Sequence, residues 1–491
     1  MSKHKRSVKK GSSSSRAWFL VNAAFLTLYT VLTAFFIFKM YAHQFLAFRY
    51  VNFILTGVLI AVFVFALTFL LLKKAKLLTT LLLLLFSLLS TAGIYLVQST
   101  VDIAEKLNQT ASYSEIEMSV VVPTSSSIQD ISEVGQIQAP TNNDGENIQA
   151  LMTDLQTNKN VNLTPETVDS YQQAYENLLA GSTQAMVLNS AYSSLLELAD
   201  AEYASKVRTL YTYKITKEVA SPQADEQTEV NKNPNVINIY ISGIDTYGSI
   251  STVSRSDVNI IMTINMETHK VLLTTTPRDA YVQIPDGGAD QYDKLTHAGI
   301  YGVETSMKTL ENLYDVDIDY YARINFTSFM QLIDVLGGVE VQNDQAFTSG
   351  GYSYPAGTVS LNSEQALRFV RERYSLQGGD VERGRNQQKV ISAIINKLAS
   401  VNSITNFTTI INSLQNSVQT NMPYDTMIQL ANKQLSSGGS FAVTSQDVTG
   451  TGSTGQLPSY AMPSAALYMM SLDQTSVDTA KQAIKNTMEG N

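Results

Sequence analysis

Three uninterrupted apolar runs fill the first hundred positions of this 491-residue chain. They are Ala17–Phe38, Val51–Leu72 and Leu77–Gln98, and none of them contains a charged side chain. Each has 22 residues, which as an α-helix extend about 33 Å, close to the ~30 Å hydrocarbon core of a bilayer. The sequence therefore predicts a three-helix transmembrane anchor at 17–98, preceded by a basic tail at 1–16.

Basic residues near the ends of the apolar runs predict how the anchor is oriented. The tail carries six Lys or Arg, the 72–77 turn three and the 39–50 loop two. We therefore expect a multi-pass protein of the cell membrane with a cytoplasmic N-terminus and everything from residue 99 outside. The chain has no cysteine, which suits a surface that does not rely on disulfides, such as that of a Gram-positive cell.

Charge is divided unevenly along the chain. Residues 1–98 contain eleven Lys or Arg and no Asp or Glu, so a total of −9 leaves −20 for the remainder. Such an acidic body argues against strong binding to nucleic acid, which requires a positive field. The absence of cysteine excludes thiolate nucleophiles and Cys-ligated metal sites.

The exported part has an α/β pattern. Residues 99–230 are expected to form a small accessory domain, with a strand at Ile116–Val122 and a short strand at Gln184–Leu188. A helix opened by Thr164 as its N-cap and a second helix over Ala191–Ala204 complete it. A polar linker at 221–234 follows.

The next domain is expected at 235–400. It contains strand-length β-branched runs at Val236–Ile241, Val258–Ile264 and Val271–Thr275, and segments of helical spacing. These helical segments are Met307–Leu313, Phe326–Leu336, Asn362–Glu372 and Arg383–Leu398. A polar C-terminal extension at 401–491 is expected to complete or flank this domain, with helices near Ile404–Val418 and Asp425–Gln434 and a surface loop over Ser436–Gln456.

Arginine is concentrated in the middle of the exported part. Eight of its nine arginines lie between positions 255 and 385: Arg255, Arg278, Arg323, Arg368, Arg371, Arg373, Arg383 and Arg385. Because arginine suits bidentate contact with phosphate oxygens, the clustering predicts a phosphate site. Pairing with Glu364, Glu372, Asp380 and Glu382 on a solvated surface is the alternative.

Connectivity predicts where some of these residues meet. Short links between the three strands favour an up-down-up meander, which places one set of charged residues at a single sheet edge. The set is Asp245, Arg255, Asp257, Arg278 and Asp279. Carboxylates beside arginines suit a magnesium–diphosphate site.

A second basic cluster follows. Arg383 and Gln387 share one helix face near its N-terminus, where an anion is favoured. Arg371 and Arg373 cannot share a helix face, and both reach one phosphate only if the helix ends there. His297 is interpreted as a structural hydrogen-bonding residue, and Asp315, Asp317 and Asp319 as a turn that enters a strand.

Together these residues resemble the LytR-CpsA-Psr family. The matching pieces are Ser242-Gly243-Ile244-Asp245, Arg255-Ser256-Asp257, Thr276-Pro277-Arg278-Asp279, His297-Ala298, Arg323-Ile324-Asn325-Phe326, Gln365-Ala366-Leu367, Arg371-Glu372-Arg373 and Asp380 through Gln388. The close resemblance covers Val236–Leu398. Three membrane helices followed by an accessory domain are similar to the capsule subgroup of the family.

The resemblance implies an α/β/α catalytic domain with a mixed central sheet and a magnesium-dependent glycan phosphotransferase, Mn²⁺ being the alternative metal. Such an enzyme attaches polyprenyl-diphosphate-linked capsular polysaccharide to peptidoglycan and releases polyprenyl phosphate, with capsule-synthesis membrane proteins as further partners. By motif, Asp245 and Asp257 would hold the metal, and Arg278, Arg371, Arg373, Arg383 and Gln387 the diphosphate, with Arg255 nearby.

The resemblance leaves the general base open between two carboxylates and implies a site for the lipid tail. Either Asp257 or Asp279 assists deprotonation of the acceptor, and the lipid tail is expected to enter an apolar tunnel in the catalytic domain. The alternatives to the transferase are a regulator or sensor of capsule synthesis in the membrane, or a pyrophosphatase that acts on the same lipid.

Overall fold

The computed structural model describes residues 11–111, 113–218, 233–244, 250–399 and 418–491. These residues divide into two compact units, one made of Met1–Glu105 with Pro423–Gly439 and the other of Lys106–Met422 with Ser440–Asn491. The expected helix at 404–418, apart from its last residue, and the side chain of Asp245 lie outside the described residues, as does most of the 221–234 linker.

The first unit contains the three predicted apolar helices, α1 (Gly11–Ala42), α2 (Val51–Leu72) and α3 (Lys76–Ala111). Each is long and apolar enough to cross a membrane. Small polar side chains join the helices: the hydroxyls of Thr33 and Ser90 lie 3.0 Å apart in the buried contact between α1 and α3. Hydrogen bonds of this kind hold transmembrane helices together, because hydrocarbon offers polar groups no other partner.

Helix α15 (Tyr424–Ser437) belongs to the same unit as the anchor. It packs against the loop between α1 and α2, where Asn432 donates a 2.8 Å hydrogen bond to the carbonyl oxygen of Gln44. The rings of His43 and Tyr424 lie 6.1 Å apart. The helix expected over Asp425–Gln434 is therefore confirmed, and it contacts the loop that joins the first two apolar helices.

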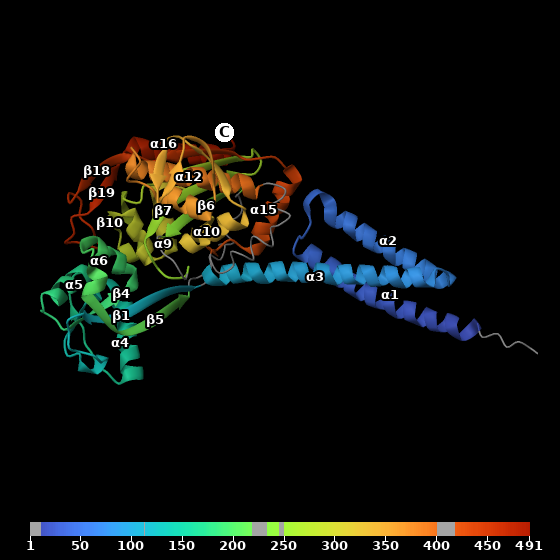
Figure 1. The fold of residues 1–491 in the computed structure, drawn as a ribbon, viewed down its shortest axis with the longest axis horizontal. Helices are drawn as coiled ribbons and strands as arrows, with labels where there is room; N and C mark the ends of the chain where they lie inside the picture. The colour runs from blue at the N-terminus through green and yellow to red at the C-terminus, as the bar shows by residue number, and fades with distance from the viewer. Residues whose placement is uncertain (1–10, 112, 219–232, 245–249, 400–417) are drawn as a thin grey trace, which may run out of the picture. The chain divides into compact units, whose positions relative to one another are not determined.

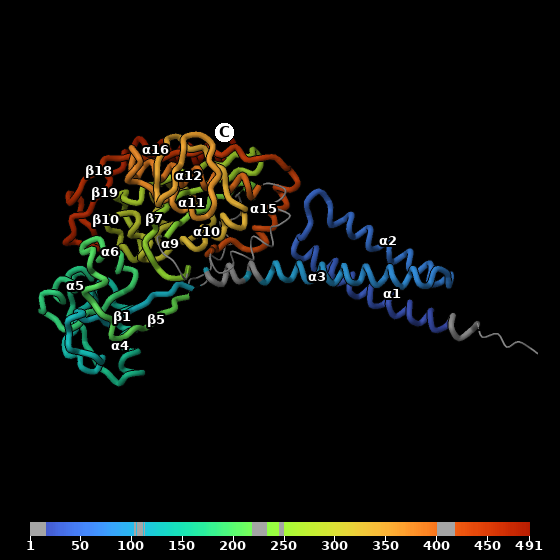
Figure 2. Tube along the Cα trace, in the orientation of Figure 1, coloured from blue at the N-terminus to red at the C-terminus, as the bar shows by residue number. Residues whose placement is uncertain are grey.

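The second unit begins with a five-stranded mixed sheet of order β3-β2-β4-β1-β5, drawn in teal and green in Figure 2. Its strands are β1 (Tyr113–Pro123), β2 (Ile137–Ala139), β3 (Glu166–Thr167), β4 (Ala185–Asn189) and β5 (Val207–Glu218). Helix α4 (Thr141–Lys159) packs on one face, while α5 (Tyr171–Leu179) and α6 (Ser193–Ala199) pack on the other; α7 (Tyr203–Lys206) precedes β5.

Two helix boundaries predicted for this part are wrong. Helix α5 begins at Tyr171 rather than at Thr164, because the Ser170 side chain accepts the backbone N–H of Gln173 and caps the helix there. The single helix expected over Ala191–Ala204 is interrupted at Asp200, whose backbone is extended. Its carboxylate instead accepts hydrogen bonds from the side chains of Tyr175 and Lys206.

The larger part of the second unit is built on a six-stranded mixed sheet of order β16-β11-β6-β7-β8-β17 (Figure 1). Its strands are β6 (Val236–Ile244), β7 (Ser256–Asn265), β8 (Lys270–Thr275), β11 (Tyr320–Ile324), β16 (Val418–Thr420) and β17 (Ala442–Asp447). The first three are consecutive antiparallel neighbours, as the meander prediction requires.

Helices cover both faces of this sheet, which gives the expected α/β/α layers. Side chains alternate along each strand: Tyr240, Ile261 and Leu272 pack under α9 (Val303–Tyr314) and α16 (Gln474–Glu489). The neighbouring residues Ile241, Ile260 and Leu273 pack under α12 (Gly379–Leu398).

Shorter elements complete the domain. They are β9 (Tyr281–Ile284), β10 (Gln291–Lys294), α8 (Leu295–Ala298), α10 (Phe326–Val335), β12 (Val339–Asn343), β13 (Phe347–Ser349), β14 (Tyr352–Tyr354), β15 (Gly357–Leu361), α11 (Ser363–Arg371), β18 (Gly450–Thr454) and β19 (Tyr468–Leu472). The surface loop expected over Ser436–Gln456 is wrong, because this segment contains β17 and β18. Strand β17 pairs in parallel with β8 and forms one edge of the central sheet.

Two interpretations from the sequence agree with the structure. His297 is fully buried, and its Nδ1 lies 2.9 Å from Oδ1 of Asp293, which also accepts the hydroxyl of Ser459. This pair fixes α8 against the C-terminal segment. Asp315 ends α9, and the Asp319 carboxylate accepts the backbone N–H of Asn238 where the chain enters β11.

Candidate active site

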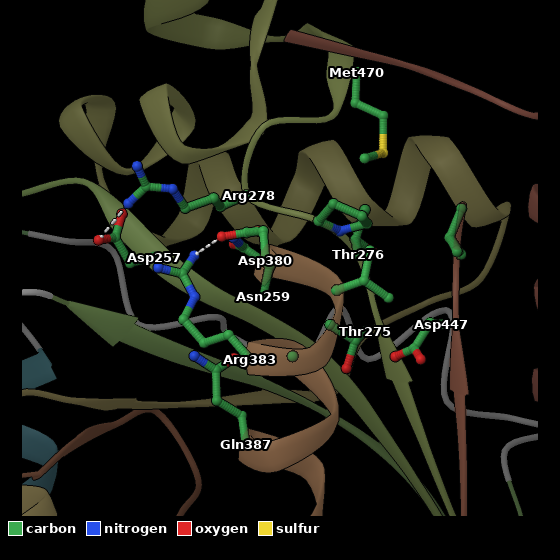
Figure 3. A pocket seen from close by; sticks show the side chains of 14 residues that line it. Asp257, Asn259, Thr275, Thr276, Arg278, Asp380, Arg383, Gln387, Asp447 and Met470 are labelled. Carbon is green, nitrogen blue, oxygen red and sulfur yellow. Dashed lines mark hydrogen bonds and ion pairs between the residues drawn. The ribbon is translucent and has the colours of Figure 1, made fainter. Parts of the chain in front are cut away.

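The edge where β7 begins and β8 ends carries the first group of charged residues. The meander places Arg255 and Asp257 at the start of β7, and Arg278 and Asp279 just after β8. Nη1 of Arg278 lies 2.8 Å from Oδ2 of Asp257, as the dashed line in Figure 3 shows. Each of these two side chains is about one-eighth exposed.

The environment of Asp257 favours its ionised form. Burial alone would raise the pKa of this carboxyl group, but the guanidinium groups of Arg278, Arg255 and Arg383 outweigh it. The pKa of Asp257 is therefore below its usual range. The hydroxyl of Thr296 donates a 3.0 Å hydrogen bond to Oδ1 and fixes the plane of the carboxylate.

Asp279 has a different surrounding. Its Oδ1 lies 2.6 Å from Nζ of Lys294, which is 5% exposed, and 3.6 Å from Nε of Arg278. The carboxylate thus joins a buried lysine to the arginine. Neither Lys294 nor Thr296 was singled out from the sequence. Both lie in the β10–α8 segment just before His297, and only the tertiary fold brings them to the sheet edge.

The second basic cluster comes from α11 and α12. Helix α11 ends at Arg371 and the backbone of Glu372 is extended, which meets the condition under which Arg371 and Arg373 can approach one ligand. The guanidinium of Arg371 stacks on the ring of Phe326 at 4.2 Å, and that of Arg373 on Tyr374 at 4.6 Å.

Arg383 lies in the second turn of α12, and its Nη2 is 2.6 Å from Oδ1 of Asp380. Its guanidinium points toward Arg278 and Asp257 in Figure 3. Gln387, one turn further along the same face, donates a 3.3 Å hydrogen bond to the carbonyl oxygen of Val370.

Two cavities meet at this charged cluster. The larger, about 370 Å³, is lined mainly by apolar side chains. They include Ile241, Ile244, Val258, Ile324, Phe326, Phe329, Leu367, Val370, Ile391 and, from α6 of the accessory domain, Leu198. The smaller, about 30 Å³, has a larger share of polar residues in its lining, among them Asn259, Thr275, Asp380 and Asp447.

Four residues line both cavities: Asp257, Arg278, Arg383 and Gln387. Arg255, Arg371 and Arg373 line the apolar cavity alone, whereas Asp279 lines neither of the two. The arrangement offers an apolar chamber whose polar end is cationic. Such a shape fits an amphiphile with an anionic head group.

The other clustered arginines do not line these cavities. Arg323 is 4% exposed and donates to the backbone carbonyls of Ile250 and Thr252, so its role is structural. Arg368 is exposed on α11, and Arg385 pairs with Asp447 at 3.1 Å from a largely exposed position. Five of the eight arginines therefore form the site.

Within the described residues, no group of three or more His, Cys, Asp or Glu side chains could hold a metal ion. Asp257 is the described member of the predicted metal-binding pair. Its lowered pKa favours the ionised form, and among the described carboxylates it is the one that lines both cavities.

The fold and the site define a class of protein: an α/β/α domain that follows three helices of membrane-spanning length and has an apolar chamber with a cationic end. A protein-family model described as the LytR_cpsA_psr family matches residues 205–486, more than half of the chain. The chain therefore belongs to the LytR-CpsA-Psr family. A second model, the DNA polymerase processivity factor, matches residues 73–188, which include the whole of the apolar helix α3.

Several curated relatives are similar to the chain. The polyisoprenyl-teichoic acid–peptidoglycan teichoic acid transferase TagU of Oceanobacillus iheyensis is 36% identical over 240 residues, which cover 47% of this chain and 73% of the relative. TagU of Enterococcus faecalis is 34% identical over 235 residues, which cover 47% and 76%.

Solved structures of TagU and TagT are also similar to part of this chain. The crystal structure of Bacillus subtilis TagU superposes with a TM-score of 0.41 and 29% identity, over 52% of this chain and 97% of that one. The structure of TagT bound to LI-WTA superposes with a TM-score of 0.42 and 28% identity, over 53% and 94%.

Proposed function

We propose that this protein is a membrane-anchored transferase that moves a glycopolymer from a polyprenyl diphosphate carrier to peptidoglycan. The observation that carries the proposal is the meeting of an apolar chamber and a polar pocket at Asp257, Arg278, Arg383 and Gln387. A lipid tail fits the chamber, and the diphosphate fits the cations at its end. The names of the curated relatives support the reaction class.

Capsular polysaccharide is the polymer that we propose. The similarity of the three-helix anchor and accessory domain to the capsule subgroup supports it, whereas the relatives cited above are named for teichoic acid. Both polymers share a carrier lipid diphosphate, so the same cationic cluster serves either one.

In the proposed reaction an acceptor hydroxyl oxygen forms a bond to the sugar-linked phosphorus. The bond from that phosphorus to the bridging oxygen breaks, and polyprenyl phosphate leaves with the bridging oxygen. Arg278 and Arg383 neutralise the charge that develops on the diphosphate oxygens. We propose Asp257 as the carboxylate that receives the acceptor proton, because it lines both cavities whereas Asp279 lines neither.

Magnesium dependence is part of the proposal. Mg²⁺ is commonly bound by one or two carboxylates together with substrate phosphates, and the ionised Asp257 at the cationic end of the chamber fits that donor set. Asp245 is proposed as the second carboxylate, with Mn²⁺ as an alternative ion. When bound, the ion would neutralise charge on the diphosphate.

We also propose that residues from 99 onward lie outside the cell. The contact between Asn432 and the loop at Gln44 agrees with three membrane crossings, because it requires the 39–50 loop and the C-terminal extension to share one side of the membrane. The proposal that this side is the outside rests on the basic residues near the helix ends. The count of basic residues predicts the same side for both.

The test uses the full chain in detergent with a lipid-diphosphate glycan, magnesium and peptidoglycan. We expect release of polyprenyl phosphate and a covalent glycan–peptidoglycan conjugate, and Arg278→Ala should remove at least 99% of the release. Arg368→Ala, a surface arginine outside the cavities, is the matched control. Equal release by Arg278→Ala would overturn the site, and lipid cleavage without conjugate would identify a pyrophosphatase. Binding without turnover would identify a sensor.

A further inference from the structure

A third cavity, of about 260 Å³, lies where the accessory domain packs on the larger domain of the same unit. No residue of its lining belongs to the two cavities of the active site. Backbone hydrogen bonds fix this contact: Glu115 N–H donates to Ser251 at 3.0 Å, and Val253 N–H donates to Glu115 at 3.2 Å. The cavity walls are therefore positioned by both domains.

Part of the lining is apolar and aromatic. Val253 and Ile300 come from the larger domain, and each is at most 6% exposed. Tyr192 comes from the accessory domain, where its ring lies 4.5 Å from that of Tyr171 and is held in place by it. An aromatic ring and aliphatic side chains can pack against the C–H face of a pyranose, a surface that is apolar despite the hydroxyls at its rim.

The rest of the lining is polar and well ordered. Asp144 accepts hydrogen bonds from the Tyr171 hydroxyl at 2.6 Å and from the side-chain amides of Asn147 at 2.6 Å and Asn189 at 2.9 Å. The side-chain oxygen Oδ1 of Asn147 accepts no hydrogen bond among the described residues, although Asn147 is only 7% exposed. Buried acceptors normally have partners, and a ligand hydroxyl would supply one here.

Charge separates this cavity from the active site. Its ionisable lining residues are Asp144, Glu146 and Lys217, besides tyrosines, with Lys217 only 3.3 Å from Glu146. The local balance is negative, so a phosphate or carboxylate ligand is disfavoured. A lipid tail is disfavoured by the amides and the carboxylates.

We propose that this cavity binds one neutral sugar residue of a glycan, either of the transferred polymer or of the peptidoglycan chain. The choice between these two sources rests on the proposed function, whereas sugar binding itself does not. Bound there, a glycan would be held by both domains at a point separate from the diphosphate site. This gives the accessory domain a role in recognition.

The test measures sugar binding to the full chain in detergent by saturation-transfer NMR. One probe is an N-acetylglucosamine tetramer, which represents the peptidoglycan backbone, and the other is the polymer freed from its lipid. Gly145→Leu is the blocking variant, because a Cβ at this cavity-lining glycine meets no atom within 4 Å. Ala150→Leu is the matched control on the same helix, since Ala150 does not line this cavity but lines a neighbouring surface groove, which shares Glu146 with it.

We expect the wild type and Ala150→Leu to bind at least one probe, and Gly145→Leu to bind it at least tenfold more weakly. The probe that binds identifies the source of the sugar. Asn143→Ala should also weaken binding; Asn143 is an exposed lining residue whose side-chain amide donates a 3.0 Å hydrogen bond to the carbonyl oxygen of Asp169, so the fold of this variant is checked by its unfolding midpoint. Release of polyprenyl phosphate from a short lipid-diphosphate substrate should be unchanged in all variants. No binding of either probe to the wild type, or equal binding by Gly145→Leu, would overturn the proposal.

Discussion

Asp257 and its arginines depend on one another for their charge state. The carboxylate stays ionised in a buried place because Arg278, Arg255 and Arg383 surround it, and it in turn separates guanidinium groups that would repel. Removing one member of a buried ion pair leaves an uncompensated charge and costs on the order of 3 kcal/mol. We therefore expect Asp257→Asn to lower the stability of the fold at neutral pH as well as the activity.

The sign of the pH dependence follows from the lowered pKa. A carboxyl group whose pKa is lower in the folded state stabilises the fold fully above its unfolded pKa of about 3.9. That contribution disappears as the pH falls through the folded value. The difference in unfolding midpoint between the wild type and Asp257→Asn should be constant from pH 7 to about pH 5 and decrease below about pH 4. A difference that grows on acidification would contradict this account.

Arg371 and Arg368 offer a matched pair of arginines on one helix. Only Arg371 lines the apolar cavity, next to Phe326, whereas Arg368 is exposed elsewhere on α11. Loss of a cation that stabilises transition-state charge typically lowers kcat by about 10²–10³. We expect Arg371→Ala to lose activity on that order and Arg368→Ala to stay within about twofold, measured as polyprenyl phosphate release. Equal losses would remove Arg371 from the site.

At the residue scale, motif order and strand directions were enough to predict which charged residues meet at the sheet edge. They could not distinguish Asp257 from Asp279, because both lie at the same sheet edge. The distinction comes from the two cavities, which Asp257 lines and Asp279 does not, while Lys294 pairs with Asp279. Counting arginines also included Arg323, which is buried against backbone carbonyls. Burial of that kind is invisible in a single sequence.

At the scale of elements, helix α6 connects the accessory domain to the proposed lipid site. Leu198 lines the apolar cavity although it is 49% exposed. Covering this side chain with lipid is worth roughly 1 kcal/mol, and a charge there adds a desolvation penalty. We expect Leu198→Asp to weaken binding of a long polyprenyl diphosphate about tenfold, measured by competition in detergent.

The neighbouring exposed residue provides the control for this helix. Glu197→Ala should leave the affinity for the long lipid within about twofold, because Glu197 does not line the cavity. A lipid diphosphate with a very short tail should bind wild type and Leu198→Asp with similar affinity. If the short lipid loses affinity equally, Leu198 acts through the fold and not through contact with the tail.

The C-terminal edge of the sheet shows why some elements escaped prediction. The segment that forms β17 and β18 is rich in Gly, Ser and Thr, which favours a loop. What makes it a strand is parallel pairing of Val443 with Val271 and its neighbours, far away in sequence. Gln388 of α12 adds hydrogen bonds to Thr275 and Asp447, which tie the edge to the core. The helices of the larger domain at 307–313, 326–336, 362–372 and 383–398 needed no such long-range partner and were predicted, whereas α4 and α16 were missed and the start of α5 was misplaced.

At the scale of the whole molecule, the positions of the apolar runs and of the basic residues predict how the chain is oriented in the membrane. The anchor is basic, and the part of the chain after it has a net charge of −20. If the basic residues stay in the cytoplasm, the N-terminal tail lies on the cytoplasmic side of the membrane and the domains after the anchor lie on the other side. The contact between α15 and the 39–50 loop agrees with three membrane crossings, and the count of basic residues then predicts which side is the outside. Regulation by direct contact with DNA would need the opposite orientation.

The chain lends itself to a direct test of orientation, because it contains no cysteine. A single cysteine at Gln149 on α4, or at Lys74 in the turn between α2 and α3, is exposed in the structure. In intact protoplasts, a membrane-impermeant maleimide should label Gln149→Cys at once and Lys74→Cys only after permeabilisation. Both should be labelled equally in detergent, which controls for reactivity. Labelling of Lys74→Cys alone in intact protoplasts would reverse the topology and exclude transfer to peptidoglycan.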